Sequence, residues 1–416
     1  MRKLFSYENG LLLMMCLCNG VVALDRLTIN FLAKPIQDEF HLSNTQLGLL
    51  ASALSLVIAP SGFLLAWVAD STRRRKLILL VTLVAFSLFS ALPALVYAYP
   101  MLLAARLLLG AAEGPILPVA QSVMAIESSP ARRGFNMGIM QNLGAAVIGV
   151  GLGPIIFTQL ADHFGWRTAF LASCIPGLLL ALAILVWMRP VNEPAPSMGA
   201  LPGREGGLME VLRTRNILIC IAIAGLFSAW LLVQNVFLAL YLQTHDGLSL
   251  TQAGALIGLT GVAQAISGTV MPALSDRIGR KPALFIMTAF GVVAPLATLM
   301  VPGASPFLGL ALFVGWLAGG AGPLYISIIP TESVSPRHAA TAVAIALASG
   351  EIIGGVMGPT IAGRAADAYG LAAPFWITAG AAAICAALSL LLTETAPRKI
   401  AFSLRDKEGP RRSVGG

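Results

Sequence analysis

Four charged side chains stand in stretches that are otherwise apolar: the adjacent Asp25 and Arg26, then Arg106 and Glu113. The chain is 57% hydrophobic and only 11% charged, so these four are exceptions to its composition. Ionisable groups at membrane depth are costly, so they usually face a cavity and mark a path for a substrate or an ion. The four residues therefore predict a transporter.

The spacing of these charges suggests what they could do. Arg106 and Glu113 are seven residues apart, close to two helical turns, so both project from one face of a helix. With Asp25 and Arg26 the four charges sum to zero and can neutralise one another. A substrate carboxylate would displace an acidic partner from an arginine, and the displaced carboxylate would accept a proton. The alternative interpretation is a permanent structural pair between Asp25 and Arg106.

Long apolar stretches must position these residues. Runs of about 20 apolar residues recur along the chain, and short alternating strands are absent. We therefore expect an all-α integral membrane protein. Hydropathy and turn signals predict about twelve helices, near residues 9–34, 43–69, 77–98, 100–126, 135–161, 168–188, 216–243, 250–274, 282–302, 304–330, 338–363 and 371–393.

The basic residues predict the orientation. If the N-terminus lies inside, most of the 27 Lys and Arg residues fall in inner segments, including the run Arg73-Arg74-Arg75-Lys76. Both termini are then cytoplasmic by the positive-inside rule. This topology accounts for the net charge of +8 without a nucleic-acid partner. Compact loops favour a multi-pass protein of a bacterial inner membrane, with the lipid bilayer as its surroundings.

One long polar interruption divides the predicted helices six and six. It runs from Pro190 to Arg215 and is rich in proline, glycine and charge. We therefore predict an N-terminal six-helix bundle at 1–189, a cytoplasmic linker at 190–215, a C-terminal six-helix bundle at 216–393 and a cytoplasmic tail at 394–416.

The two predicted bundles share a loop pattern. An acidic residue followed by a basic cluster occurs at Asp70 to Lys76 and returns almost half the chain later at Asp276 to Lys281, which indicates a parallel internal repeat. The second copy, D-R-x-G-R-K, resembles the major facilitator superfamily. The first copy departs from this pattern at Ser71 and Arg73.

This resemblance implies two bundles that rock about a midplane site. It also implies that acidic loop residues latch the inner gate against neighbouring helix ends. The gating candidates are Asp70, Arg74, Asp276, Arg277 and Arg280. The alternative is that the basic loop residues only enforce the topology.

Further segments resemble the anion:cation symporter branch of this superfamily. They are Asp25-Arg26-Leu27-Thr28-Ile29-Asn30, Ile36-Gln37-Asp38-Glu39-Phe40, the run from Arg106 to Gly114, and Gly165-Trp166-Arg167. Members of the branch carry sugar acids and other carboxylates, in bacteria with protons. The resemblance implies Asp25 and Glu113 as protonatable carboxylates, and Arg26 and Arg106 as cations for an anion or for pairing.

Other polar residues fall on the presumed cavity helices. Glu351 has no obvious partner in an apolar or small-residue run, so it is a candidate second proton site or a group that reaches a water-filled cavity. The remaining substrate-binding candidates are Asn30, Gln141, Gln234, Asn235, Tyr241, Gln264, Tyr325 and Ser349. The alternative for this set is hydrogen bonding between helices.

These features predict a secondary active transporter that couples an organic anion to protons by alternating access, with no cofactor besides the proton. The alternative is a proton-coupled exporter of an amphiphile, a lysolipid as in the spinster-like branch, or a drug. Gly149 to Pro154 looks somewhat like an exporter signature, although it overlaps with ordinary glycine packing. The sequence holds no catalytic constellation or nucleotide loop, so we expect no enzyme. We expect a monomer.

Overall fold

The computed structural model describes residues 7–129, 132–191, 207–335 and 338–396, and this part of the chain is helical, without strands. The helices of the N-terminal half are α1 (Tyr7–Phe31), α2 (Ala33–Phe40), α3 (Asn44–Thr72), α4 (Arg75–Ala91), α5 (Tyr99–Glu113), α6 (Ile116–Glu127), α7 (Arg133–Gly144), α8 (Gly153–Phe164) and α9 (Trp166–Trp187).

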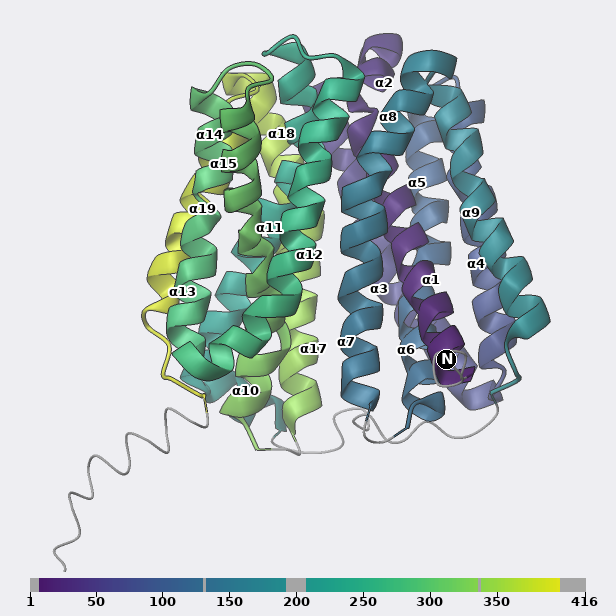
Figure 1. Cartoon of the computed structure of the whole chain (residues 1–416), viewed down its shortest axis with the longest axis vertical. Coiled ribbons are helices and arrows are strands. Elements are labelled where there is room, and N and C mark those ends of the chain that lie inside the picture. Colours follow the sequence, from purple (N-terminus) through teal and green to yellow (C-terminus); the bar gives the residue numbers. More distant parts are fainter. Residues whose placement is uncertain (1–6, 130–131, 192–206, 336–337, 397–416) are drawn as a thin grey trace, which may run out of the picture.

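The C-terminal half follows, and Figure 1 shows the two halves side by side. Its helices are α10 (Gly207–Arg213), α11 (Arg215–Thr244), α12 (Leu250–Ile278), α13 (Arg280–Phe290), α14 (Val293–Met300), α15 (Pro306–Trp316), α16 (Ile329–Ser333), α17 (Ala339–Ser349), α18 (Gly358–Tyr369) and α19 (Ala373–Ser389). Most of the predicted linker, 192–206, and of the predicted tail, 397–416, lies outside the described residues.

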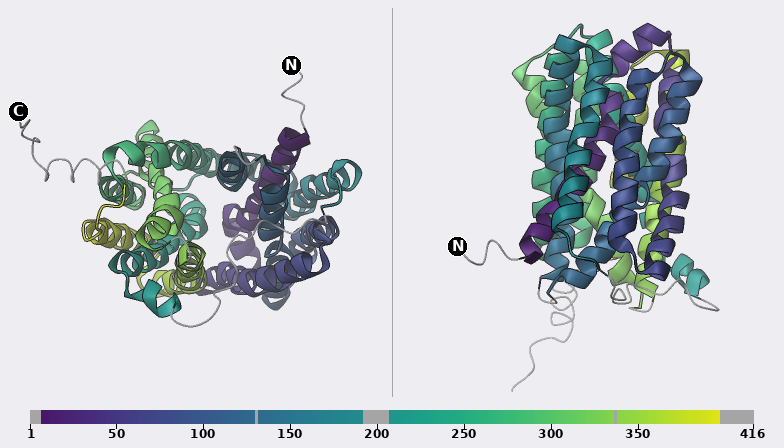
Figure 2. Two further views of the ribbon diagram at one scale, coloured as in Figure 1. Left: turned by 90° about the horizontal axis from the view of Figure 1, so that it is seen from below. Right: turned by 90° about the vertical axis from the view of Figure 1, so that its right-hand side faces the viewer.

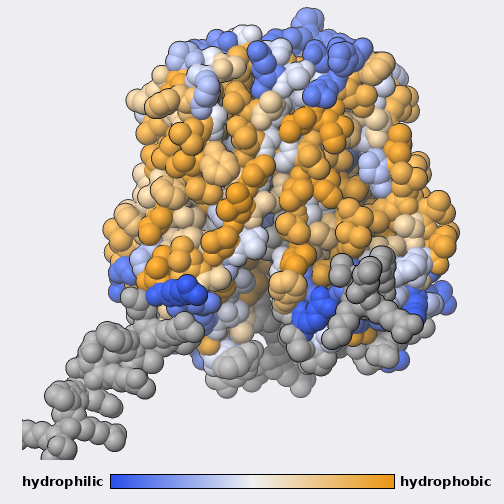
Figure 3. Space-filling model, in the orientation of Figure 1, coloured by the Kyte–Doolittle hydropathy of each residue, from blue (hydrophilic) through white to orange (hydrophobic). Residues whose placement is uncertain are grey.

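The helices are long and apolar enough to cross a bilayer. In the described part of the chain, eleven helical runs have this length and composition, and α19 adds a shorter apolar helix. Figure 3 shows a hydrophobic belt between two polar ends. Large apolar side chains such as Phe63 and Leu56 are more than half exposed within this belt, as lipid contact requires. The prediction of an all-α membrane protein built from two six-helix bundles is confirmed.

We name the two polar ends by their loops. At the basic end α3 leads into α4 and α12 leads into α13, and this end carries the basic clusters; it is the lower end in Figure 1. At the far end α3 and α12 begin, and α2 lies there, at the top of Figure 1. The right-hand view in Figure 2 shows the helices running between these two ends, and the left-hand view looks along them from the basic end.

Two π-helical segments, Ala145–Leu152 and Gly350–Met357, occupy matching places in the two halves. Each is followed by a Gly-Pro pair, with proline at positions 154 and 359. Proline lacks an N–H group and its ring clashes with the carbonyl four residues earlier, so a regular α-helical turn cannot form there. A π-helical turn is a common way to absorb this defect and is frequent at functional sites. The first segment packs on α12 of the other half, and the second packs on α3.

Small residues let the two halves approach closely along these contacts. A Cβ atom added to Gly48 of α3 would lie 2.2 Å from the carbonyl oxygen of Pro359, and one added to Gly261 of α12 would lie 2.3 Å from the backbone nitrogen of Gly151. Both distances are well inside van der Waals contact. The two seams, α3 with α18 and α12 with α8, therefore depend on glycine.

Each seam is closed at the far end by a carboxylate on the start of a helix of the other half. Asp367 of α18 accepts hydrogen bonds from the backbone N–H groups of Asn44 and Thr45, at 2.8 and 2.9 Å, and from the Thr45 hydroxyl at 2.6 Å. Asp162 of α8 accepts from the hydroxyl of Thr251, in the first turn of α12, at 2.9 Å. A carboxylate near a helix N-terminus is stabilised by the free N–H groups and the helix dipole. We call these two contacts the far-end latches.

A second contact at the far end fixes α2, which links α1 to α3. Glu39 accepts hydrogen bonds from Trp166 Nε1 at 2.8 Å and from Arg167 Nη1 at 2.6 Å. The hydrogen bond from Arg167 lowers the pKa of Glu39 from its ordinary value, against partial burial. Glu39 and the Trp166-Arg167 pair belong to two of the segments that resemble the symporter branch, so these segments meet in space.

Candidate functional site

The four charged residues of the N-terminal half converge between α1 and α5. Asp25 and Arg106 are each 1% exposed and Glu113 is 5% exposed, whereas the Arg26 side chain is 25% exposed. Arg26 Nη1 lies 3.5 Å from Glu113 Oε1. Two helices that are far apart in sequence thus bring opposite charges together inside the hydrophobic belt, as the spacing of these residues predicts.

Asp25 and Arg106 lie deeper and keep unused hydrogen-bonding capacity. They interact electrostatically, and the hydroxyls of Ser90 and Ser173 lie beside the Asp25 carboxyl. Yet both oxygens of Asp25, and Nε and Nη2 of Arg106, lack a hydrogen-bond partner among the described residues. Buried groups of this kind are costly unless something binds them. Asp25 and Arg106 are therefore not a fully satisfied structural pair in this conformation.

Arg26 adds a central contact between the two halves. Its Nη2 lies 3.7 Å from Glu351 Oε2, on the π-helical segment of the C-terminal half, and 3.3 Å from the hydroxyl of Ser55 on α3. Ser55 itself is 4% exposed. Arg26 is thus shared by Glu113 on one side and Glu351 on the other, each at a distance longer than a direct hydrogen bond.

A cavity of about 20 Å³ touches both arginines. Asn30 and Ser55 line it from the N-terminal half, and Val236 and Gly355 line it from the other half. This volume suits about one water molecule. This enclosed part of the site therefore holds no solute as large as a sugar acid in the described conformation.

A larger groove is lined by α3, α5 and the segment 356–361. Its volume is about 490 Å³ and its wall is almost wholly apolar, with Leu49, Leu103 and Met357 among its residues. The two polar groups in it, the hydroxyls of Ser52 and Thr360, bond to each other at 2.8 Å. None of the predicted site residues lines this groove.

The remaining predicted residues of the C-terminal half have mixed surroundings. Gln234 is fully buried and its amide has no hydrogen-bond partner among the described residues. The Oε1 atom of Gln264 is also buried and also lacks a partner there. Asn235 makes a hydrogen bond within its own helix: its amide donates to the carbonyl of Leu231 at 2.9 Å. The ring of Tyr325 packs edge-on against Phe227 at 5.9 Å. The two glutamines remain the stronger candidates for substrate contact.

Three further predicted residues serve helix packing in this conformation. Tyr241 lies in the last turn of α11, stacked on His245 at 4.6 Å. The Ser349 hydroxyl donates to the carbonyl of Ile221 at 3.3 Å. The backbone carbonyl of Gln141 accepts from Asn19, and the Gln141 side chain is exposed. The side chain of the neighbouring Asn142 lies outside the described residues.

Two further polar groups of the membrane-spanning part were missed by sequence reasoning. Ser55 touches Arg26, and a serine in an apolar helix gives no signal of such a contact. Trp316 is 1% exposed, its ring lies 5.3 Å from that of Trp230, and its Nε1 lacks a partner among the described residues. A buried tryptophan usually finds an acceptor for its N–H, so Trp316 keeps an unused donor in the C-terminal half.

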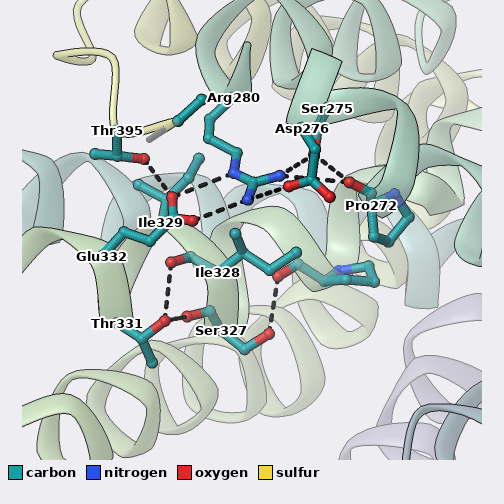
Figure 4. A network of polar contacts seen from close by, with 12 residues as sticks. Pro272, Ser275, Asp276, Arg280, Ser327, Ile328, Ile329, Thr331, Glu332 and Thr395 are labelled. Carbon is teal, nitrogen blue, oxygen red and sulfur yellow. Dashed lines mark hydrogen bonds and ion pairs between the residues drawn. The ribbon is translucent and has the colours of Figure 1, made fainter. Parts of the chain in front are cut away.

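The predicted gating residues form compact networks at the basic end. In the C-terminal half, Arg280 Nη2 lies 2.6 Å from Asp276 Oδ1 and 2.8 Å from Glu332 Oε1, and Thr395 donates to Glu332 at 2.7 Å (Figure 4). Arg280 also donates to the hydroxyl of Ser275 at 2.5 Å. Arg277 stands in the last turn of α12 and makes no ion pair in the described part of the chain.

The N-terminal network has a different arginine from the predicted one. Asp70 pairs with Arg75, which is 2% exposed, at 2.7 Å, and Arg75 Nε donates to Ser122 on α6 at 2.8 Å. Arg74 is the residue that precedes α4, and the described residues offer it no ion pair. Both networks join elements of a single half in this conformation.

Neutralising Glu332, which binds both Arg280 and Thr395, should destabilise the basic end. We expect Glu332→Gln to cost about 1–3 kcal/mol, because the almost buried Arg280 then loses a charged acceptor. The measurement is the unfolding temperature in detergent. Asp38→Asn is the matched control, since Asp38 pairs with Lys34 on an exposed helix face and such pairs contribute little. Equal unfolding temperatures for both variants would contradict the prediction.

Comparisons with known proteins place this geometry in a family. A model described as Major Facilitator Superfamily matches residues 15–346 and 218–414. A hexuronate transporter of Bacillus subtilis is 27% identical over 93% of this chain and 95% of its own. A 3-(3-hydroxy-phenyl)propionate transporter of Escherichia coli is 24% identical over 86% of this chain and 88% of its own.

The fold has solved counterparts. A bacterial homologue of the human lysosomal transporter Spinster, crystallised in an inward-facing and unoccupied conformation, superposes with a TM-score of 0.77. It is 20% identical and covers 93% of this chain and 97% of its own, so the likeness concerns the fold alone. The relatives and structural neighbours are membrane transporters rather than enzymes, as the sequence predicts. The chain belongs to the Major Facilitator Superfamily.

Proposed function

We propose that this protein is a symporter that couples an organic anion, a sugar acid or another carboxylate, to protons. The observation that supports it best is the position of Arg26, a cation inside the hydrophobic belt with carboxylates of both halves at 3.5 and 3.7 Å. A bidentate substrate carboxylate would make shorter, charge-assisted hydrogen bonds to this guanidinium. The similarity to transporters named for hexuronate and for an aromatic acid agrees with this ligand chemistry.

The coupling follows from the burial of Glu113. When a substrate carboxylate takes Arg26, Glu113 loses its nearest cation while it remains 5% exposed. An unpaired buried charge is expensive, so Glu113 takes up a proton. When substrate leaves, Arg26 recovers its partner and the proton is released. Substrate and proton are thus bound and released together, which is the requirement for symport.

Asp25, Arg106 and Asn30 complete the proposed site. Arg106 supplies unused donors, and Asn30 lines the same small cavity as both arginines. Asp25 balances the charge of Arg106 and is the second protonatable group of the N-terminal half. Gln234 and Trp316 offer neutral hydrogen-bonding groups from the other half for hydroxyls of the substrate.

We further propose that the basic end faces the cytoplasm of a bacterial cell, as the distribution of Lys and Arg predicts. The described conformation, closed by the far-end latches, is then the one that releases substrate inward. The protein would act as a monomer in the inner membrane, with no cofactor besides the coupling proton.

A second candidate function is export of an amphiphile. It is favoured by the apolar groove of about 490 Å³, which, like the Arg26 cavity, is lined by α3 and by residues between 355 and 361. An amphiphile with an anionic head would place its tail in such a groove and its head at Arg26. Sugar acids have no tail for this groove, so the two candidates differ in their substrates.

Uptake into proteoliposomes under an inward proton gradient tests the proposal. The solutes offered are sugar acids, aromatic acids and short dicarboxylates, and the lumenal solutes are identified by mass spectrometry. Accumulation of an acid that is lost when the gradient is collapsed supports symport. If the folded protein accumulates no acid but moves a fluorescent lysolipid, export of an amphiphile replaces the proposal.

Arg26→Lys provides a residue-specific test in the same assay. Lysine keeps the charge but cannot form the bidentate contact, so we expect transport efficiency to fall about tenfold or more, equivalent to about 1.4 kcal/mol. Arg364→Lys is the matched control, because Arg364 is exposed on α18 and makes no ion pair in the described part of the chain. Unchanged uptake by Arg26→Lys would remove Arg26 from the substrate site.

A further inference from the structure

Glu351 adds a negative charge to the central site, where the four charged residues of the N-terminal half already sum to zero. It lies on the π-helical segment Gly350–Met357 and its side chain is 36% exposed. The Glu351 carboxylate lies beside Gly355 of the same segment. A Cβ atom added to Gly355 would lie only 3.1 Å from Glu351 Oε2. The missing side chain at Gly355 therefore leaves the room in which Glu351 reaches Arg26.

The surroundings of Glu351 contain one cation and one other carboxylate. Arg26 of α1 pairs with it, and Glu113 of α5 is close enough to repel it. The packed helices α3, α11 and α17 place no charged side chain there in the described residues, and α3 offers the hydroxyl of Ser55. On α18 the charged residues, Arg364 and Asp367, lie farther along the helix toward the far end.

A count of charges sets the number of protons. Asp25, Arg26, Arg106 and Glu113 balance one another, so an ionised Glu351 leaves the site with a net charge of −1 when it is empty. A bound monoanion would change the net charge of the site from −1 to −2 inside the hydrophobic belt. Uncompensated charge at this depth is strongly unfavourable. One proton on Glu113 therefore does not restore neutrality, whereas two protons do.

On the basis of the function proposed above, we propose that Glu351 carries a second proton and that a monoanionic substrate travels with two protons. Glu113 and Glu351 hold Arg26 from opposite halves, at 3.5 and 3.7 Å, in the empty carrier. A substrate carboxylate that takes Arg26 displaces both of them. Each displaced carboxylate binds one proton, and each gives it up when substrate leaves and Arg26 is shared again.

The two carboxylates differ in their access to water, so they exchange protons at different stages of the cycle. Glu351 is 36% exposed and exchanges protons with water directly, whereas Glu113 at 5% exposure depends on the opening of the site. Arg26 and Glu351 also join the two halves, so protonation of Glu351 releases one of the contacts between them. One cycle carries two protons and one monoanion, and therefore one net positive charge.

The balance of gradients at which net flux stops measures this stoichiometry. The probes are glucuronate, galactonate and 3-hydroxyphenylpropionate, all monoanions, with the membrane potential clamped at zero. With two protons each pH unit balances about a 100-fold substrate gradient, and with one proton about a tenfold gradient. We expect the 100-fold dependence for the unmodified protein at zero potential. In a separate measurement without a pH gradient, an inside-negative potential should drive its uptake.

Three variants separate the possible outcomes. Glu351→Gln should show the tenfold dependence and no response to the potential, Glu351→Asp should keep the 100-fold dependence, and Asp38→Asn should not differ from the unmodified protein. A tenfold dependence in the unmodified protein, or a 100-fold dependence in Glu351→Gln, would overturn this inference and leave symport intact. If no probe accumulates at all, the inference falls together with the proposed function.

Discussion

Glu113→Gln protein should exchange substrate across the membrane but should lose about a factor of ten of its accumulation for each pH unit of proton gradient. Glutamine keeps the shape of protonated Glu113 and cannot release a proton. Arg26 is then free of its 3.5 Å partner on both sides and keeps only Glu351, at 3.7 Å. The proton carried by Glu113 is therefore lost while substrate binding and the conformational change continue.

The measurement compares two modes in the same proteoliposomes. Counterflow of labelled against unlabelled substrate should proceed at a rate similar to that of the unmodified protein. Net uptake driven by a gradient of one pH unit should stop near a tenfold substrate ratio instead of about 100-fold, and near a ratio of one when Glu351→Gln is added. Asp38→Asn, an exposed carboxylate paired with Lys34, should retain both modes. Normal accumulation by Glu113→Gln would exclude Glu113 as a coupling residue.

The same experiment shows how Glu113 and Glu351 share the coupling. Loss of Glu351 should reduce the number of protons to one, because Glu113 still titrates when substrate takes Arg26. Loss of Glu113 should likewise leave one proton, carried by Glu351. Accumulation should end altogether only when both carboxylates are replaced.

Much of the fold could be predicted because it depends on one-dimensional features. The length of each apolar run sets where a helix can cross, so the predicted 216–243 lies close to the observed Arg215–Thr244. The convergence of Arg106 and Glu113 with the α1 pair was also accessible. Both residues stand on one helical face, and a charge in the bilayer requires a partner.

Other features depend on where the two halves approach each other, which the sequence does not state. The contact of Arg26 with Glu351 forms only because the π-helical segment and Gly355 bring α18 and its preceding turn against α3. The pairing of Asp70 with Arg75 rather than Arg74 has a local cause. Arg73 adopts a left-handed conformation, with φ of 58°, and turns the chain so that the later arginine points inward.

The far-end latches were also missed, although the sequence contains a signal for them. Ser43-Asn44-Thr45-Gln46 and Ser249-Leu250-Thr251-Gln252 are matching capping boxes at the starts of α3 and α12. Asp162 and Asp367 stand in matching places near the ends of α8 and α18. The repeat was visible, but the crossing of each carboxylate to the opposite half requires the packed structure.

Neutralising both latches should open the far end. Asp162→Asn with Asp367→Asn removes the two carboxylates that bind the first turns of α12 and α3. Each exposed carboxylate at a helix N-terminus contributes up to about 1 kcal/mol, so together they account for about 2 kcal/mol. This corresponds to about a 30-fold shift of the equilibrium between the state closed at the far end and the state open there.

Distances between spin labels at positions 97 and 307 would report this opening. Tyr97 and Phe307 are 79% and 74% exposed, at the far ends of the two halves. Cys174, the one described cysteine that is not buried, is replaced by serine first. We expect a longer distance to gain population in the double variant, and less so in each single variant, because the latches lie on separate seams and distant sites act additively. Distances that match those of Asp38→Asn would show that the seams alone hold the far end closed. In that case the glycine contacts at Gly48 and Gly261, rather than the two carboxylates, would set the preference for this conformation.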